Sequence, residues 1–231
     1  MNNQRIRVVF LTDSLSLPRD IPEKVSYEET FVYLLKKEYP NIEFIQFAYG
    51  GATISDLRNQ ADYLKSFSPN VLILQAGIVD CAPRTTTRFE SDFISRIPLL
   101  SKLIFRMLRN NASSIRKIRR ITYTNPRSFE ENLKKINSMF NGSRVYAIGI
   151  LPASLNYERK VPGITSNILL FNEKLKSVFR NNFIDTSDFD ESYVMSDFFH
   201  LNKKGHLSIY KKLNSIINVN SQIYSGKIST E

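Results

Sequence analysis

Five short segments rich in apolar residues are spaced along the chain, and amphipathic stretches occupy most of the intervals between them. Segments with few polar interruptions are typical of strands buried on both faces of a parallel sheet. They predict strands at 8–11, 42–48, 70–76, 144–150 and 182–185. The residues from Val71 to Leu74 are all apolar, so we expect the third strand to lie at the centre of the sheet.

Apolar residues at helical spacing occur between these strands. They predict helices at 27–39, 54–67, 128–140, 165–180 and 202–217. Strands and helices that alternate through short connections indicate an α/β protein, with a parallel sheet of about five strands and helices on both faces. The 231 residues contain no linker-like segment, so we expect one domain at 1–217 and a flexible polar tail at 218–231.

The alternation is interrupted between the third and fourth predicted strands. Residues 85–142 contain only helical patterns, and we interpret them as a basic helical insertion. The part from 96 to 120 has no acidic residue and eight basic ones, which are Arg96, Lys102, Arg106, Arg109, Arg116, Lys117, Arg119 and Arg120. A lid with solvated charges and a segment that binds an anionic membrane surface or a lipid-linked substrate both fit this pattern. We do not expect nucleic-acid binding, because stacking aromatics and a recognised motif are lacking.

The composition narrows the possible chemistry. The net charge of +10 indicates an anionic partner or surface without identifying it. The single cysteine, Cys81, excludes an internal disulfide, and two histidines without a cysteine cluster argue against a metal site, so we expect no metal and no other cofactor. The sequence shows no membrane span and no signal-peptide pattern. We therefore expect a cytoplasmic protein, placed at the inner face of the membrane if the insertion binds lipid.

Polar or glycine-rich segments follow the first three predicted strands, at 12–14, 50–53 and 77–80. Carboxyl ends of parallel strands face the ligand crevice of an open α/β sheet. Ser14 is therefore a candidate nucleophile, although serine and aspartate after a strand commonly cap the next segment. Near the end of the chain, Asp197 precedes His200 by three residues, a spacing that suits a carboxylate orienting an imidazole base or, alternatively, a simple turn cap beside a packed histidine.

Together these segments resemble the sequence blocks of the SGNH (GDSL) hydrolase family. Thr12-Asp13-Ser14-Leu15 is similar to the first block, with threonine in place of the usual glycine. Gly50-Gly51-Ala52-Thr53 is similar to the glycine block, and Asp197-Phe198-Phe199-His200 to the terminal D-x-x-H block. Their order and spacing match the family over nearly the whole chain, apart from the insertion and the tail.

The resemblance implies a flavodoxin-like three-layer α/β/α sandwich, in agreement with the predicted strand order. It also implies that Ser14 is the nucleophile, that His200 is the general base and that Asp197 orients His200. The backbone N–H groups of Ser14 and Gly51 would then donate to the oxyanion.

One position departs from the family pattern. The third family block is G-x-N-D, in which asparagine supplies an oxyanion donor, whereas Val79 occupies that position here and has no donor. Loss of one such donor lowers the rate by about 10²- to 10³-fold. Arg84 could replace it or bind a substrate carboxylate or phosphate, or it could pair with an acid at the surface. We predict that Asp13, Asp80 and Arg84 contact the substrate.

These features predict a serine esterase or acyltransferase that acts through an acyl-enzyme. The family resemblance favours O-acyl groups, above all O-acetyl, carried by a sugar or polysaccharide intermediate, with an acylated carbohydrate or another acyl donor as the binding partner. The other hypothesis, suggested by Val79, is a catalytically silent relative that binds a glycan or an anionic ligand.

Overall fold

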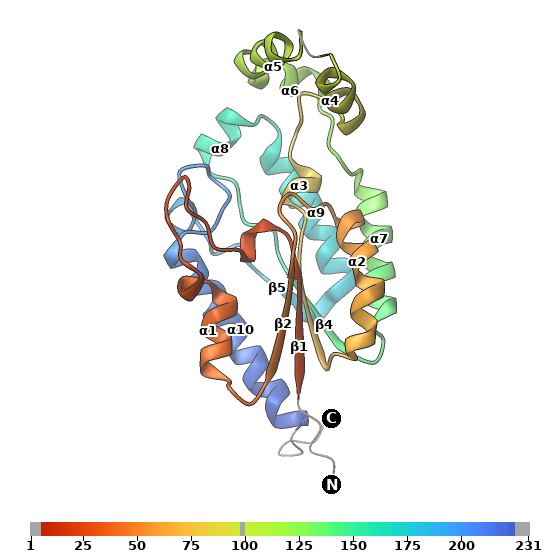
Figure 1. The fold of residues 1–231 in the computed structure, drawn as a ribbon, viewed down its shortest axis with the longest axis vertical. Coiled ribbons are helices and arrows are strands. Elements are labelled where there is room, and N and C mark those ends of the chain that lie inside the picture. Colours follow the sequence, from red (N-terminus) through yellow and green to blue (C-terminus); the bar gives the residue numbers. More distant parts are fainter. Residues whose placement is uncertain (1–5, 98–99, 225–231) are drawn as a thin grey trace.

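A five-stranded parallel sheet forms the centre of the molecule (Figure 1). The computed structural model describes residues 6–97 and 100–224. The strands are β1 (Arg7–Thr12), β2 (Glu43–Ala48), β3 (Val71–Gln75), β4 (Arg144–Ile148) and β5 (Phe183–Ile184), in the spatial order β2-β1-β3-β4-β5. All five predicted strands are present, and this order is that of a flavodoxin-like sheet. The predicted fold class is confirmed.

The strand register aligns the carboxyl ends of the first three strands. Thr12, the last residue of β1, pairs with Ala48 of β2 on one side and with Gln75 of β3 on the other. These two residues are also the last residues of their strands. The segments that follow β1, β2 and β3 therefore leave the sheet at the same edge.

Two helical layers cover the sheet, as Figure 1 shows. One face carries α1 (Phe31–Glu38) and α10 (Lys203–Tyr224). The other carries α2 (Ile54–Leu64), α7 (Pro126–Met139) and α9 (Ile164–Phe179), of which α7 packs against both α2 and α9. Shorter elements connect the strands and these helices: α3 (Ile78–Cys81), α8 (Leu155–Lys160) and 3-10 turns at Ser14–Ser16, Tyr27–Glu29, Lys65–Phe67, Arg180–Asn182 and Glu191–Tyr193.

The core lies on both sides of β1 and β3, because these strands have neighbours in the sheet and helices above and below. Every residue of β3 is buried, as the unbroken apolar run from Val71 predicts. Local signals determine where the covering helices begin. Thr53 and Asp56 form a capping box at the start of α2, and Asn125 caps α7 ahead of Pro126.

The helical insertion is shorter than predicted. It consists of α4 (Arg88–Ser95), α5 (Ser101–Asn110) and α6 (Ala112–Arg119), none of which has a buried residue in the described part. In Figure 1 these helices lie beyond the sheet, at the end where the strands finish. The predicted range 85–142 wrongly includes α7, whose buried face joins the core through Phe129, Leu133 and Ile136. Periodicity alone could not separate α7, because no strand lies between it and the insertion.

The last helix is longer than predicted. We expected the helix to end at 217 and a flexible tail to begin at 218, but α10 continues to Tyr224. Asn220 is 1% exposed and donates to the hydroxyl of Tyr146 and to the carbonyl of Ile216, while Arg144 donates to its Oδ1. The tertiary hydrogen bonds of Asn220 thus stabilise the last turns of α10, which the polar sequence after 217 did not indicate. Residues 225–231 lie outside the described part of the chain. No helix in the described part is both long enough and apolar enough to cross a membrane.

Candidate active site

Ser14 lies at the start of a tight turn directly after β1. The Asp13 carboxylate accepts a hydrogen bond of 2.9 Å from the N–H of Leu15 and so caps the 3-10 turn that begins with Ser14. Ser14 is 9% exposed and lines a cleft of about 590 Å³. The other residues that line the cleft are Arg19, Gly50, Gly51, Ile78, Val79, Ala82, Pro83, Arg84, Arg116, Tyr123, Tyr157, Lys160, Val161, Asp197, Phe199 and His200.

A continuous chain of hydrogen bonds joins Ser14, His200 and Asp197. Ser14 Oγ lies 3.1 Å from His200 Nε2, across 186 positions in the sequence. His200 Nδ1 lies 2.6 Å from Asp197 Oδ2. The structure therefore brings together all three residues predicted to be catalytic, in the relative arrangement of nucleophile, base and orienting carboxylate.

Asp197 is held as an ionised carboxylate by the loop that carries it. Its Oδ1 accepts hydrogen bonds from the backbone N–H groups of Phe199 and His200, at 3.2 and 3.1 Å. Partial burial opposes ionisation, but the hydrogen bonds from His200 and Phe199 outweigh it and hold the pKa of Asp197 below its ordinary value. A charged Asp197 favours the tautomer in which Nδ1 carries the proton and Nε2 presents a lone pair.

The backbone around His200 is held on both sides. The N–H of Met195 donates to the carbonyl of His200 at 2.7 Å, and the ring of Phe199 lies 4.1 Å from the imidazole, centre to centre. Phe198 has a φ of 79°, a region that L-residues rarely adopt. Such strain persists only where surrounding contacts determine the conformation, and it is concentrated at functional sites.

Arg19 also contacts the base, and the sequence analysis did not identify it. Its Nη2 lies 2.6 Å from His200 Nε2, closer than Ser14 Oγ. A guanidinium only donates, so Arg19 and the Ser14 hydroxyl share the single lone pair of Nε2. Arg19 reaches this place because it forms a two-way backbone bridge with Val25, in a loop that carries no recognised motif. No sequence signal could have predicted the contact.

The two residues that carry the candidate oxyanion donors, Ser14 and Gly51, line the cleft. Among the residues that the structure describes, none accepts a hydrogen bond from the N–H of Ser14 or of Gly51. Gly51 has a φ of 72°, which a residue with a side chain rarely adopts, so glycine is needed for the turn after β2. Both N–H groups therefore stay candidate oxyanion donors.

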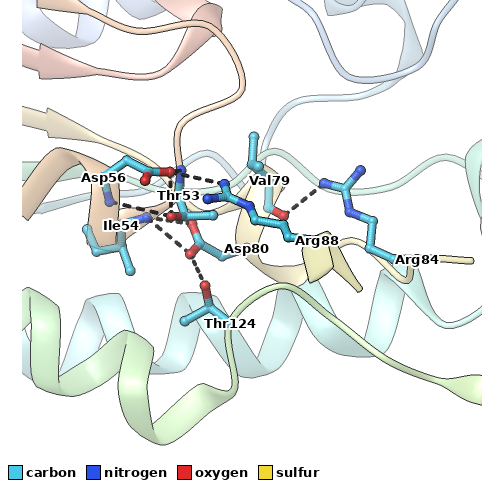
Figure 2. A network of polar contacts seen from close by, with 8 residues as sticks. All are labelled: Thr53, Ile54, Asp56, Val79, Asp80, Arg84, Arg88 and Thr124. Carbon is cyan, nitrogen blue, oxygen red and sulfur yellow. Dashed lines mark hydrogen bonds and ion pairs between the residues drawn. The ribbon is translucent and has the colours of Figure 1, made fainter. Parts of the chain in front are cut away.

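Val79 lines the cleft, and Arg84 lies beside it. Arg84 donates from Nη2 to the carbonyl of Val79 at 2.8 Å, and its guanidinium lies 4.4 Å from the centre of the Tyr123 ring. Arg84 lines the cleft, and within the described residues it forms no ion pair with Asp80, so its contact with substrate stays a prediction. Figure 2 shows its guanidinium reaching Val79 on the side away from Asp80.

Asp13 and Asp80 do not face the cleft, so the prediction that they contact substrate is wrong. Both are 0% exposed. The Asp80 carboxylate accepts from the N–H of Ile54, at 3.1 and 3.0 Å, and from the hydroxyl of Thr124 at 2.5 Å (Figure 2). It therefore links α3 to the first turn of α2 and to the segment before α7. Sequence position placed both acids at the correct edge of the sheet, but only packing determined that they point inward.

Burial raises the pKa of both acids. It raises the pKa of Asp80 to about 6, even though the hydrogen bonds from Thr124 and Ile54 oppose the shift. Burial, with a smaller contribution from the charge of Asp80, raises the pKa of Asp13 to about 7. Asp13 Oδ2 has no hydrogen-bond partner within 6–97 and 100–224, which favours the protonated carboxyl.

The remaining histidine, His206, and the cysteine, Cys81, are packed in the core. His206 Nδ1 accepts from the N–H of Phe31 at 3.3 Å, and burial lowers the pKa of His206 to about 4. Cys81 is fully buried, and burial raises the pKa of its thiol. Within the described ranges, no group of three or more His, Cys, Asp or Glu residues is arranged to hold a metal ion.

Comparisons with known proteins identify the fold. No protein-family model and no curated protein sequence matches the chain. A lipase/acylhydrolase from Enterococcus faecalis matches with a TM-score of 0.64 and 14% identity, over 94% of this chain and 96% of its own. An acetyl xylan esterase gives 0.61 and 15%, over 92% and 100% of the two chains. An acetylxylan esterase from Geobacillus stearothermophilus, solved as a catalytic mutant, gives 0.60 and 14%, over 92% and 94%. The chain therefore has the three-layer fold of these esterases and lipases.

The buried acid at Asp13 predicts a measurable dependence of stability on pH. An acid whose pKa is higher in the folded chain binds more protons when folded, so its stabilising contribution is complete at low pH and is lost as the pH rises through the folded-state value. For Asp13 this window runs from the ordinary value of 3.8 to about 7. Asp13→Asn lacks this titration. We therefore expect the free energy of unfolding of Asp13→Asn, relative to that of wild type, to rise by about 2 kcal/mol as the pH increases from about 5 to about 8, as measured by urea denaturation. The exposed Asp92→Asn is the control, and parallel curves for wild type and Asp13→Asn would contradict the prediction.

Proposed function

We propose that the chain is a serine esterase or acyltransferase that acts on O-acyl groups of a sugar or polysaccharide intermediate. The observation that supports this proposal best is the hydrogen-bonded chain from Ser14 Oγ through His200 to Asp197. Two further observations support it. The candidate oxyanion donors line the same cleft, and structures with the same fold include a lipase/acylhydrolase and two acetylxylan esterases.

The geometry suits covalent catalysis in two steps. Ser14 Oγ attacks the carbonyl carbon of the ester, and its proton passes to His200 Nε2. Asp197 stabilises the resulting imidazolium through Nδ1, while the N–H groups of Ser14 and Gly51 donate to the carbonyl oxygen as it becomes negative. The leaving alcohol takes the proton from Nε2, and an acyl-Ser14 ester remains. Water or an acceptor hydroxyl then attacks this ester, with His200 again taking and returning the proton.

Arg19 must move for the first step to occur. The lone pair of Nε2 accepts the proton of Ser14, but in this structure an N–H of Arg19 points at the same nitrogen. For this step, we expect Arg19 to leave His200 Nε2 and to find another partner.

The preference for O-acetyl groups on a carbohydrate is the most specific part of the proposal. It is supported by the two acetylxylan esterases among the structures of like fold and by the size and lining of the cleft. The walls combine aromatic side chains such as Tyr123, Tyr157 and Phe199 with polar groups, which is typical of small-molecule sites.

A fluorophosphonate probe tests the nucleophile directly. We expect the wild type to be labelled at Ser14, Ser14→Ala to show no labelling, and His200→Ala to react about 10²-fold more slowly because the general base is lost. The control is Ser196→Ala, which removes an exposed serine from the loop that carries Asp197. Intact-protein mass spectrometry reports the modified fraction. If no labelling occurs at any pH between about 6 and 9, the proposal that the chain is an enzyme is contradicted, and a catalytically silent binding protein is favoured.

Hydrolysis and transfer use the same residues and differ in the group that attacks the acyl-enzyme. We expect an acetyl donor to release acetate in water, and a sugar acceptor to divert acetyl groups from acetate to acetylated sugar if the chain is a transferase. Chromatography of the products with and without the acceptor measures the division. Release of acetate alone with every acceptor would identify a hydrolase.

For the insertion, we propose an anionic membrane surface as the partner. On α5, Leu103 and Met107 are more than half exposed and lie one turn apart on one face, and Leu100 precedes them on the same side. Lys102, Arg106 and Arg109 follow at helical spacing on the adjacent face. Within the described residues, none of these three cations forms an ion pair. An apolar face flanked by free cations supports attachment to anionic lipid.

Vesicle flotation tests this partner. We expect binding to phosphatidylcholine vesicles that contain phosphatidylserine and little binding to phosphatidylcholine alone. The double variant Lys102→Glu/Arg106→Glu should lose more than about tenfold in affinity, since each cation near the surface contributes about 1 kcal/mol. The control, Lys37→Glu/Lys135→Glu, makes the same change in net charge at exposed positions on α1 and α7. Equal flotation of both double variants would contradict the proposal.

A further inference from the structure

The cleft beside Ser14 has an unbalanced charge. Four cations line it: Arg19, Arg84, Arg116 and Lys160. The single carboxylate that lines it, Asp197, is already bound to His200. Within 6–97 and 100–224, no carboxylate forms an ion pair with any of the four cations.

Arg88 shows how this chain neutralises an arginine elsewhere. It lies over the ring of Tyr123, as Arg84 does, but its guanidinium pairs with Asp56 at 3.0 Å. Figure 2 shows Arg88 turned toward Asp56 and Arg84 turned away toward Val79. Arg84 and Arg88 thus lie over the same aromatic ring, but within the described residues only Arg88 has a carboxylate that neutralises its charge.

Arg84 and Arg116 are both oriented by the backbone and both incompletely hydrogen-bonded. Arg84 donates from Nη2 to the carbonyl of Val79 at 2.8 Å, and Arg116 donates from Nη1 to the carbonyl of Lys160 at 3.0 Å. The Nε atom of each is buried and has no hydrogen-bond partner among the described residues. Within the described residues, the protein therefore leaves both guanidinium groups with unused donors.

The two guanidinium groups are also electrostatic neighbours. They come from different parts of the chain, since Arg84 follows α3 and Arg116 belongs to α6 of the insertion. A backbone bridge between Arg84 and Ile121 holds these parts together. Burial lowers the pKa of Arg116, and the positive charge of Arg84 lowers it further. The fold therefore keeps two like charges close together, in a partly desolvated place, without a protein anion between them.

We propose that Arg84 and Arg116 bind an oxyanion group of the substrate, a carboxylate or a phosphate, so that the ester cleaved at Ser14 is an anionic one. The inference rests on the proposed function and adds the charge of the substrate to it. A guanidinium offers planar, paired N–H donors that match the oxygens of carboxylates and phosphates. An oxyanion in the cleft would accept hydrogen bonds from further Nη–H groups of the two arginines, and its negative charge would offset the repulsion between them. Its negative charge would also offer Arg19 an alternative partner to His200 Nε2.

Three acetate esters test the proposal: neutral phenyl acetate, 4-acetoxybenzoate and 4-acetoxyphenyl phosphate. The measured quantity is the ratio of kcat/KM for each anionic ester to that for phenyl acetate, in wild type, Arg84→Gln, Arg116→Gln and the control Arg88→Gln. Because the esters are the same for every protein, differences in their intrinsic reactivity cancel between variants. We expect the ratio to fall about tenfold in Arg84→Gln and in Arg116→Gln, and to stay at the wild-type value in Arg88→Gln. The anionic ester with the larger loss identifies carboxylate or phosphate as the group bound.

Calorimetry with inorganic phosphate and with benzoate gives a second readout that does not depend on catalysis. Wild type and Arg88→Gln should bind at least one of the two anions, and Arg84→Gln and Arg116→Gln should bind it about tenfold more weakly. Equal ratios of kcat/KM in all four proteins, or anion binding that persists in both Arg84→Gln and Arg116→Gln, would overturn the anion site. Neither result would contradict the proposed esterase activity. If no ester is cleaved and Ser14 is not labelled, the proposed function fails, and calorimetry alone then decides whether the anion site exists.

Discussion

The alignment of strand ends around β1 is the constraint on which the rest of the site depends. Because β1 pairs in parallel with β2 and β3 and all three end at the same level, the turns that follow them converge at one edge of the sheet. Ser14, Gly51 and Val79 each come from one of these turns. The two central strands are buried on both faces, so the apolar core that stabilises the sheet also fixes the position of the candidate nucleophile.

Two buried acids connect this edge to the helices. Asp80 accepts hydrogen bonds from the first turn of α2 and from Thr124, and Asp13 caps the turn that carries Ser14. Their burial is unfavourable for the charged forms and raises both pKa values. Their value to the protein is positional: each carboxyl satisfies backbone donors that would otherwise be left without partners where the chain leaves the sheet.

The insertion changes what the cleft can recognise. A sandwich without α4, α5 and α6 would still place Ser14 next to His200, but it would lack Arg116 and the backbone bridge at Ile121. The candidate catalytic residues thus come from the edge of the sheet and the C-terminal loop, whereas the cations of the cleft come in part from the insertion. The same segment presents apolar and basic faces outward on α5, so the proposed anion site and the proposed membrane contact involve different helices of the insertion.

The sequence by itself determined the five strands and the two helical layers, because hydrophobic periodicity reports on interactions between near neighbours. It also placed Ser14 at the end of a strand and Asp197 three residues before His200, whereas the meeting of Ser14 with His200, 186 positions apart, was expected only from the family resemblance. Only the tertiary structure decided that α7 belongs to the sandwich, that α10 continues past Asn220, and that Asp13 and Asp80 point inward. It also placed Arg19 against His200, and Arg84 near Arg116. Each of these outcomes depends on contacts between segments far apart in the chain, and such contacts leave no periodic or spaced pattern in a single sequence.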